Sequence, residues 1–283
     1  MRKIERPGFN VRTVFEQCIS NMANQELRTE LTDSLDKIER SEEDFNEKKE
    51  TNEIYLIKRN VEISETANTD VLVKIYTERL VNKKNNARRY YDQILLSAPK
   101  GKCPLCNQRI ADTLDHYLPK TLYPLLSVTP INLIPACSVC NKGKLIDYPL
   151  NSEQESLHPY YDNIENEEWL KCEVLEVNPI IFKYSVQSPD CWSELLKERV
   201  MNHFNSFKLN TLYVIHAIEE FANIKFQIEK LFNNGGQQLL KDHLSDCYES
   251  RKIIDRNSWQ TAFYKALFDN DDFCRGNFIG NSY

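Results

Sequence analysis

The sequence predicts a mainly helical α+β fold in which a small irregular module lies between two helical segments. Residues 11–98 and the chain from Cys191 onward carry apolar side chains at helix-like intervals and contain few Gly or Pro residues. Residues 100–162 lose this periodicity and hold seven of the eleven prolines, together with two Cys-x-x-Cys pairs. We therefore expect an N-terminal helical segment (1–99), a central module (100–162) and a C-terminal helical segment (163–283) that packs on the module.

The amino-acid composition indicates a globular protein. The chain has 283 residues, of which 28% are charged and 41% hydrophobic, and its net charge is −6. These values are typical of a globular protein and argue against a polycation that coats nucleic acid without selectivity. The first residues show no apolar signal region, and no apolar run approaches the ~20 residues of a membrane span. We expect a soluble, cytoplasmic protein that has no membrane partner.

The pattern along the chain predicts the elements in order. In the N-terminal segment, Val71, Ile75 and Leu80 recur at near-helical intervals before Pro99 and Gly101 end the pattern. Short strands are predicted around TLDHYL (113–118) and INLIPA (131–136), and again at 167–177 and 179–187. The NNGG at 233–236 predicts a helix end. We interpret the acidic run at 41–53 as a solvated helix face or a docking surface, and the basic run at 82–92 as a solvated helix face.

The cysteines predict one structural zinc site. Cys103 and Cys106 form one Cys-x-x-Cys pair, and Cys137 and Cys140 form a second pair thirty residues further on. Two such knuckles supply the four thiolates of a closed tetrahedral site, which leaves no open position for water. The other five cysteines are scattered and odd in number, which favours reduced thiols over a disulfide framework. The acid and histidine of LDHYLPK (114–120) are then not needed as zinc ligands.

The segment between the knuckles resembles the HNH endonuclease family, in particular its zinc-supported members. The matching residues are Asp115 with His116, Asn132 before Leu133, and Asn141 directly after Cys140, with Lys144 just beyond. The resemblance covers residues 103–161. It implies a ββα-metal unit that holds one divalent cation, Mg²⁺ or Mn²⁺, against a scissile phosphate. The flanking helices resemble those of HNH nucleases paired with an ATPase in bacterial defence systems such as Septu.

The residue types fit phosphodiester hydrolysis. Histidine can deprotonate water near neutral pH, so His116 is the predicted general base. A hard cation prefers oxygen ligands, which makes Asp115 a predicted metal ligand. Adjacent residues of a strand point to opposite faces, so Asp115 and His116 would separate into a metal side and a water side. Asn132 is predicted to orient the loop around the histidine.

Two assignments stay open at this stage. Asn141 could coordinate the catalytic cation through its carbonyl, or it could cap the helix after the knuckle. His158, in the sequence SLHPYYD, could fold back toward the same cation or serve only a structural turn. Both are candidate ligands. Lys120, Lys142 and Lys144 are predicted to contact nucleic acid phosphates.

These observations favour a divalent-metal-dependent endonuclease that cuts DNA. The resemblance further implies that it is the effector of an anti-phage system with an ATPase partner. Two alternatives remain: a non-catalytic, zinc-stapled module for protein interaction, and an RNase or toxin that uses the same centre.

Overall fold

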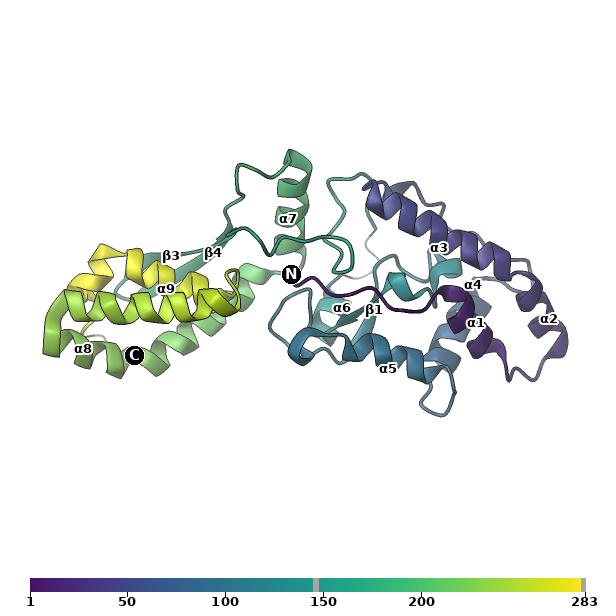
Figure 1. The fold of residues 1–283 in the computed structure, drawn as a ribbon, viewed down its shortest axis with the longest axis horizontal. Helices are drawn as coiled ribbons and strands as arrows, with labels where there is room; N and C mark the ends of the chain where they lie inside the picture. Colours follow the sequence, from purple (N-terminus) through teal and green to yellow (C-terminus); the bar gives the residue numbers. More distant parts are fainter. Residues whose placement is uncertain (145–147, 281–283) are drawn as a thin grey trace. The chain divides into compact units, whose positions relative to one another are not determined.

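The computed structural model describes residues 1–144 and 148–280; the side chain of Lys144 lies outside the described part. The chain divides into two compact units, which we call unit 1 (Met1–Asn163) and unit 2 (Ile164–Tyr283). Both units are mainly helical, and each contains one two-stranded antiparallel sheet (Figure 1). The predicted class, α+β with mostly helix, is confirmed. The packing of residues 163–283 on the central module stays a prediction.

Unit 1 combines the N-terminal helices with the central module. Its helices and strands are α1 (Val11–Ile19), α2 (Gln25–Asp33), α3 (Leu35–Glu50), α4 (Thr69–Lys74), a π-helical turn (Ile75–Leu80), α5 (Arg88–Leu96), β1 (Thr113–His116), β2 (Leu133–Ala136) and α6 (Ser138–Lys144). Asn10, Asn24 and Asn68 begin α1, α2 and α4, and each side chain accepts a hydrogen bond from the backbone N–H three residues ahead. Such caps satisfy N–H groups that have no partner inside the helix.

A single apolar core spans the first 99 residues and the module. Val14, Phe15, Ile38 and other side chains of the helices pack with Leu114 of β1 and Leu133 of β2, and all are buried. Helix α5 contacts both strands, and α6 contacts β1. The strands at 113–116 and 133–136 confirm the predicted ones. They pair so that Asp115 lies opposite Ile134 and His116 opposite Leu133.

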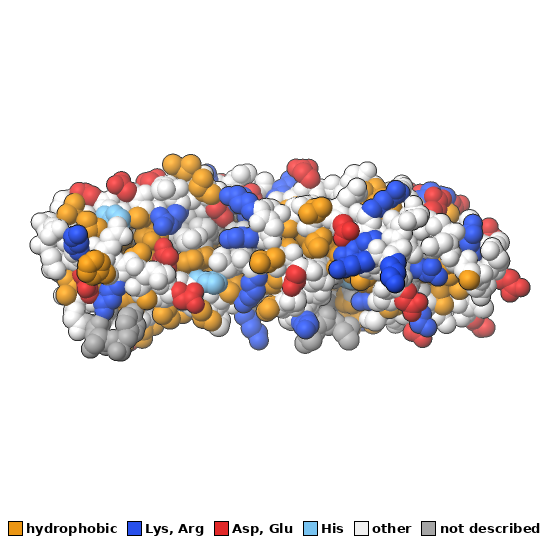
Figure 2. Space-filling view, turned by 90° about the horizontal axis from the view of Figure 1, so that it is seen from below, with side chains coloured by type: hydrophobic (Ala, Val, Ile, Leu, Met, Phe, Trp, Pro, Cys, Tyr) orange, Lys and Arg blue, Asp and Glu red, His pale blue; other side chains and the backbone are white. Residues whose placement is uncertain are grey.

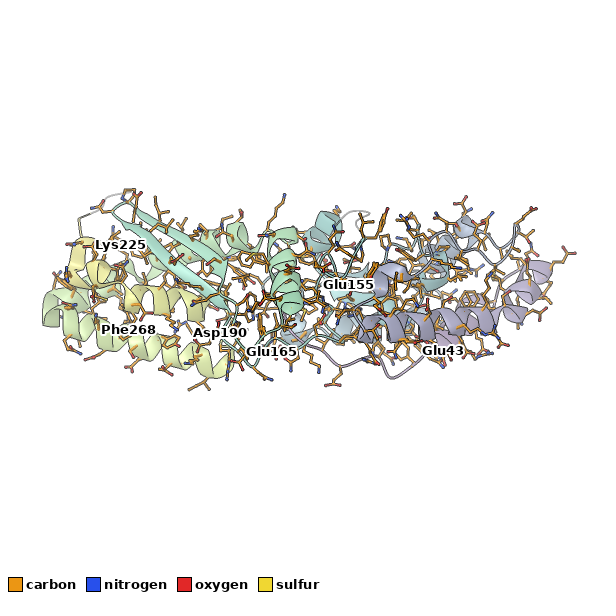
Figure 3. The ribbon with its side chains drawn as sticks, turned by 90° about the horizontal axis from the view of Figure 1, so that it is seen from above. Glu43, Glu155, Glu165, Asp190, Lys225 and Phe268 are labelled. Carbon is orange, nitrogen blue, oxygen red and sulfur yellow. The ribbon has the colours of Figure 1, made fainter. Side chains whose placement is uncertain are left out.

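Helix α3 has a buried face beside the exposed one that carries Glu43 and Glu47. Phe45 is completely buried, and the side chain of Lys49 is also inaccessible to solvent. Lys49 Nζ lies 3.0 Å from Glu155 Oε2, and Glu155 Oε1 accepts a hydrogen bond of 2.9 Å from the Ile54 N–H. Glu155, labelled in Figure 3, therefore joins α3 to the segment that follows α6.

Unit 2 has a core of its own. It contains β3 (Leu170–Val177), β4 (Ile180–Val186), α7 (Glu194–Ser206), α8 (Leu209–Ile254), α9 (Trp259–Asp269) and a π-helical turn (Phe273–Asn277). Its two strands confirm the predicted ones and form an antiparallel hairpin. Regular helix is broken inside α8 at Gly236, where φ is 67° and ψ is −157°, so the helix-ending signal at NNGG is confirmed as an interruption.

Candidate functional site

The four cysteines of the two knuckles come together in the interior of unit 1. Cys103, Cys106, Cys137 and Cys140 are all buried, and their Sγ atoms lie within 4.8 Å of one another. Thiolates bound to zinc at about 2.3 Å in a tetrahedron lie about 3.8 Å apart, so this cluster fits a four-sulfur metal site. It is the one group of three or more clustered His, Cys, Asp or Glu ligands among the residues described.

Local backbone geometry aims the thiols at a common centre. In the first knuckle, the Cys103 N–H donates to the Arg109 carbonyl at 2.8 Å, and Asn107 takes a left-handed φ of 53°. In the second, Cys137 Sγ accepts a hydrogen bond of 3.4 Å from the Cys140 N–H at the start of α6. Hydrogen bonds among the four thiols lower the pKa of Cys106 and Cys137 and raise that of Cys103 and Cys140, so the thiols share protons that a bound metal would displace.

His116 ends β1 in a buried position that fixes its tautomer. Its Nε2 lies 2.8 Å from the carbonyl oxygen of Ser127. A carbonyl oxygen can only accept, so Nε2 carries the proton and the basic lone pair of the neutral ring is on Nδ1. The Tyr76 ring packs edge-on against the imidazole, with ring centroids 4.4 Å apart. His116 is thus held on two sides, with Nδ1 as its proton-accepting atom.

Asn132 clamps the loop that supplies the Ser127 carbonyl. It is fully buried, and its Oδ1 accepts a 2.7 Å hydrogen bond from the Leu118 N–H. Its Nδ2 donates to the carbonyls of Leu118 and Leu126, each at 3.1 Å. Leu126 immediately precedes Ser127, whose hydroxyl donates to the Leu72 carbonyl at 3.0 Å. The side chain predicted to orient the histidine loop therefore bridges both ends of that loop.

Asp115 lies beside His116 in β1 and is 5% exposed. Lys120 is its cationic neighbour: burial lowers the pKa of Lys120, and the Asp115 carboxylate partly opposes that effect. Lys120 Nζ also lies 5.3 Å from the centroid of the Tyr76 ring. The structure thus brings Asp115, Lys120 and Tyr76 together around β1. Tyr76 was missed in the sequence because nothing distinguishes it there from other apolar positions of a helix.

Asn141 and His158 have different surroundings. Asn141, on α6, is half-buried, and its Nδ2 lies 3.5 Å from the Leu114 carbonyl, next to Asp115. His158 is fully buried: its Nδ1 accepts from the Tyr160 N–H at 3.2 Å, and its Nε2 donates to the Ile131 carbonyl at 3.1 Å. Both ring nitrogens of His158 therefore serve backbone groups. Of the two open ligand candidates, Asn141 is the one placed beside Asp115.

The cationic residues near the site also differ in their surroundings. Lys142 is exposed on α6, next to Asn141, whereas the Lys144 side chain lies outside the described residues. Figure 2 shows the face on which α5 lies, with Lys and Arg side chains gathered over unit 1. In this region Arg88 stacks on Tyr91 and pairs with Asp92, and Arg89 stacks on Tyr90. These two arginines are engaged by the protein's own side chains, which agrees with their interpretation as part of a helix face.

Comparison with known proteins gives one informative match. Protein ea31 of Escherichia phage lambda is 26% identical over 298 residues, which cover 98% of this chain and 100% of the phage protein. No known protein family and no solved structure matches the chain. The similarity to protein ea31 therefore extends through both units. The name of that protein does not state an activity.

Within the described residues, no helix is both long enough and apolar enough to cross a membrane.

Proposed function

We propose that unit 1 is a metal-dependent HNH endonuclease that hydrolyses phosphodiester bonds in DNA, with His116 as general base. The observation that carries this proposal is the hydrogen bond from His116 Nε2 to the Ser127 carbonyl. It leaves Nδ1 as the atom that takes a proton from water. The β1–β2–α6 order and the clamp formed by Asn132 give it further support.

Asp115 and Asn141 are the residues that would hold the catalytic Mg²⁺ or Mn²⁺. Hard cations take carboxylate and amide oxygens, and Mg²⁺ keeps several waters, so one or two protein ligands suffice. When bound, the cation would stabilise charge on the scissile phosphate. His158 is left out of this set because both of its nitrogens bond to the backbone. The four cysteines would hold zinc, which has a structural role.

Lys120 and Lys142 support a polyanionic substrate. Lys120 lies next to the Asp115 carboxylate, and Lys142 is exposed directly after Asn141. Both cations therefore stand beside the residues proposed to act on the phosphate. Lys144 belongs to the same proposal by sequence. Binding through such contacts should weaken as the salt concentration rises.

A nicking assay tests the proposal. Supercoiled plasmid is incubated with Mg²⁺ or Mn²⁺ and either the native protein, His116→Ala or the control His216→Ala in unit 2. We expect nicking by the native protein and the control, and at least a ~10²-fold loss in His116→Ala, since general-base catalysis contributes about 10²–10⁴-fold. Circular dichroism verifies that all three are folded. Equal rates for His116→Ala and the native protein contradict the proposal.

The substrate and the alternatives are separated in the same experiment. Duplex DNA, single-stranded DNA and tRNA are compared, and preferential cleavage of tRNA would favour the RNase or toxin. Absence of cleavage with every metal, in a protein that retains zinc, would favour the non-catalytic interaction module.

The defence role and the ATPase partner stay predictions from the resemblance. The relative that matches this chain comes from a phage, so the comparison gives no preference to a bacterial defence role. A plaque assay in cells that carry the native gene or His116→Ala, with and without a neighbouring ATPase gene, checks both predictions.

A further inference from the structure

A pocket of about 350 Å³ lies in unit 1 between α3 and the turn that precedes Ser127. Its walls come from α3, from residues 56–61 and from residues 123–126, and α3 contacts that turn directly. Figure 3 shows α3, which carries the labelled Glu43, along one edge of unit 1. Small-molecule sites occupy about 300–1,000 Å³, so the cavity can hold a compact ligand. It borders the loop that fixes His116.

The rim of the pocket is cationic. Lys37, Arg40, Lys48 and Lys58 line it, against the single carboxylate of Asp44. Lys48 pairs with Asp44 at 2.6 Å, and Lys37 donates to the Glu62 carbonyl. Arg40 and Lys58 are exposed, and among the described residues neither side chain has an ion pair or a hydrogen bond. Two cations are therefore available to an anionic ligand.

The wall of the pocket is apolar. Leu56 lines the pocket and is 52% exposed, and Ile57, Val61 and Leu125 add to the same surface. Tyr123 also lines the pocket but is only 3% exposed, so the surface open to a ligand is mainly aliphatic. A small-molecule site typically combines such an apolar wall with a few polar or charged groups.

We propose that this pocket binds a nucleotide, with the base against the apolar wall and the phosphate between Arg40 and Lys58. Arginine and lysine are the side chains that bind phosphates, and the flat face of a base can pack on the aliphatic wall. The nucleotide can be free, or it can belong to a nucleic acid strand. The proposal goes beyond the nuclease chemistry and does not depend on it.

The test measures binding to the full-length His116→Ala protein without added divalent cation, so that cleavage cannot interfere. The probes are AMP, ATP and a five-residue single-stranded oligonucleotide, each followed by calorimetry or fluorescence polarisation. We expect at least one probe to bind with a Kd below about 1 mM. The double change Arg40→Glu with Lys58→Glu should weaken that binding at least about tenfold, because it replaces two phosphate contacts with repulsion. Lys83→Glu with Lys84→Glu, on an exposed loop of the same unit, is the matched control and should stay within about twofold.

Tyr123→Phe gives an independent check. It removes the hydroxyl of a residue that lines the pocket and keeps the ring, so nucleotide affinity should fall by more than thermal stability changes. Binding of AMP or ATP alone identifies a free nucleotide as the ligand, and binding of the oligonucleotide alone identifies a strand. No binding of any probe to the parent protein, or equal binding to the Arg40 and Lys58 double variant, overturns the proposal.

Discussion

The hydrogen bond between His116 and the Ser127 carbonyl decides which imidazole nitrogen can accept a proton. It also makes the site sensitive to residues that never touch a substrate, because the position of Ser127 depends on its loop. Asn132 holds that loop through three hydrogen bonds to the backbone of Leu118 and Leu126. At the scale of single residues, we therefore expect Asn132 to matter for stability and Asn141 to matter for activity.

Asn132→Ala should destabilise the protein, and Asn141→Ala should not. The first change removes the Asn132 partner of the Leu118 N–H and the Leu118 carbonyl, which costs about 2–4 kcal/mol, whereas the Leu126 carbonyl still accepts from the Thr129 N–H at 3.3 Å. The second removes a half-buried side chain whose contact with Leu114 is 3.5 Å long, so the loss should stay below about 1 kcal/mol. Urea unfolding measures both. If Asn141 is a metal ligand, its variant loses nicking activity while it keeps the native midpoint of unfolding; a fully active Asn141→Ala contradicts that role.

Glu42 should make the protein less stable as pH rises from about 4.5 to 7. Burial is the main cause that raises its pKa from 4.5 to about 7, although its Oε2 accepts a 2.9 Å hydrogen bond from the Val11 N–H. In this window the folded state binds more protons than the unfolded state, so stability falls with pH. Glu42→Gln, which can still accept from Val11, should be more stable than the native protein at pH 8, by on the order of 1 kcal/mol because the side chain is partly exposed.

Thermal unfolding of both proteins at pH 4.5 and pH 8 checks this expectation. The two should unfold alike at pH 4.5 and differ at pH 8. Glu47→Gln, an exposed carboxylate on the same helix, removes the same charge and should show little difference at either pH. A Glu42→Gln variant that gains nothing at pH 8 contradicts the raised pKa.

At the scale of elements, the cysteine cluster links the loop before β1 to the first turn of α6. Because Cys140 belongs to α6 and α6 contacts β1, the cluster ties the β1–β2–α6 arrangement to the loop before β1. The backbone N–H of Arg2 also donates to the Pro104 carbonyl at 2.9 Å, so the first residues of the chain lie against the first knuckle. Loss of the metal should therefore loosen a local region rather than the entire chain.

Cys137→Ser should lower zinc content to near zero and expose β1, β2 and α6 to hydrogen exchange. A buried four-thiolate site loses most of its affinity when one ligand is removed, and the binding energy of such sites is folding energy. Elemental analysis and exchange mass spectrometry measure the two effects. Cys191→Ser, at an exposed cysteine, is the control and should retain the metal and the native exchange pattern. Normal protection of β1 and β2 in metal-free protein contradicts this view.

Many of the elements around the candidate site could be predicted from the sequence. Spacing alone indicates the knuckles, and alternation with flanking prolines indicates the strands at 113–116 and 133–136. The burial of Lys49 could not be predicted, because its partner Glu155 lies 106 residues away and a Lys in an acidic helix resembles any surface residue. The hydrogen bond from His116 to the Ser127 carbonyl could not be predicted either, because every residue has a backbone carbonyl and the sequence does not show which one accepts. The edge-on contact of Tyr76 with His116 likewise depends on tertiary structure.

At the scale of the whole molecule, the two units have separate cores. Buried aromatic residues of unit 2, among them Phe182, Phe221 and Phe263, pack with one another. The residues proposed for catalysis and for zinc all lie in unit 1. Under the proposed function, the chemistry would be confined to unit 1.

Residues 164–283 produced alone should therefore fold. We expect helical circular dichroism, a cooperative thermal transition and no nicking activity, because the fragment retains a complete core and lacks His116. Residues 1–163 should retain zinc. An unfolded C-terminal fragment would show that unit 2 depends on unit 1 for its stability.

The buried pair of Lys49 and Glu155 restricts how this protein can evolve. Removing one partner breaks a buried ion pair, at a cost of about 3–5 kcal/mol, which is a large share of the 5–15 kcal/mol that stabilises a typical protein. Replacing both with apolar residues removes the two charges together and costs less, although the Ile54 N–H then loses the Glu155 carboxylate. Evolution from the charged pair to an apolar pair therefore requires either a less stable intermediate with one substitution or both substitutions together. Among relatives of this chain, positions 49 and 155 should consequently be inherited as a matched set, although 106 residues separate them.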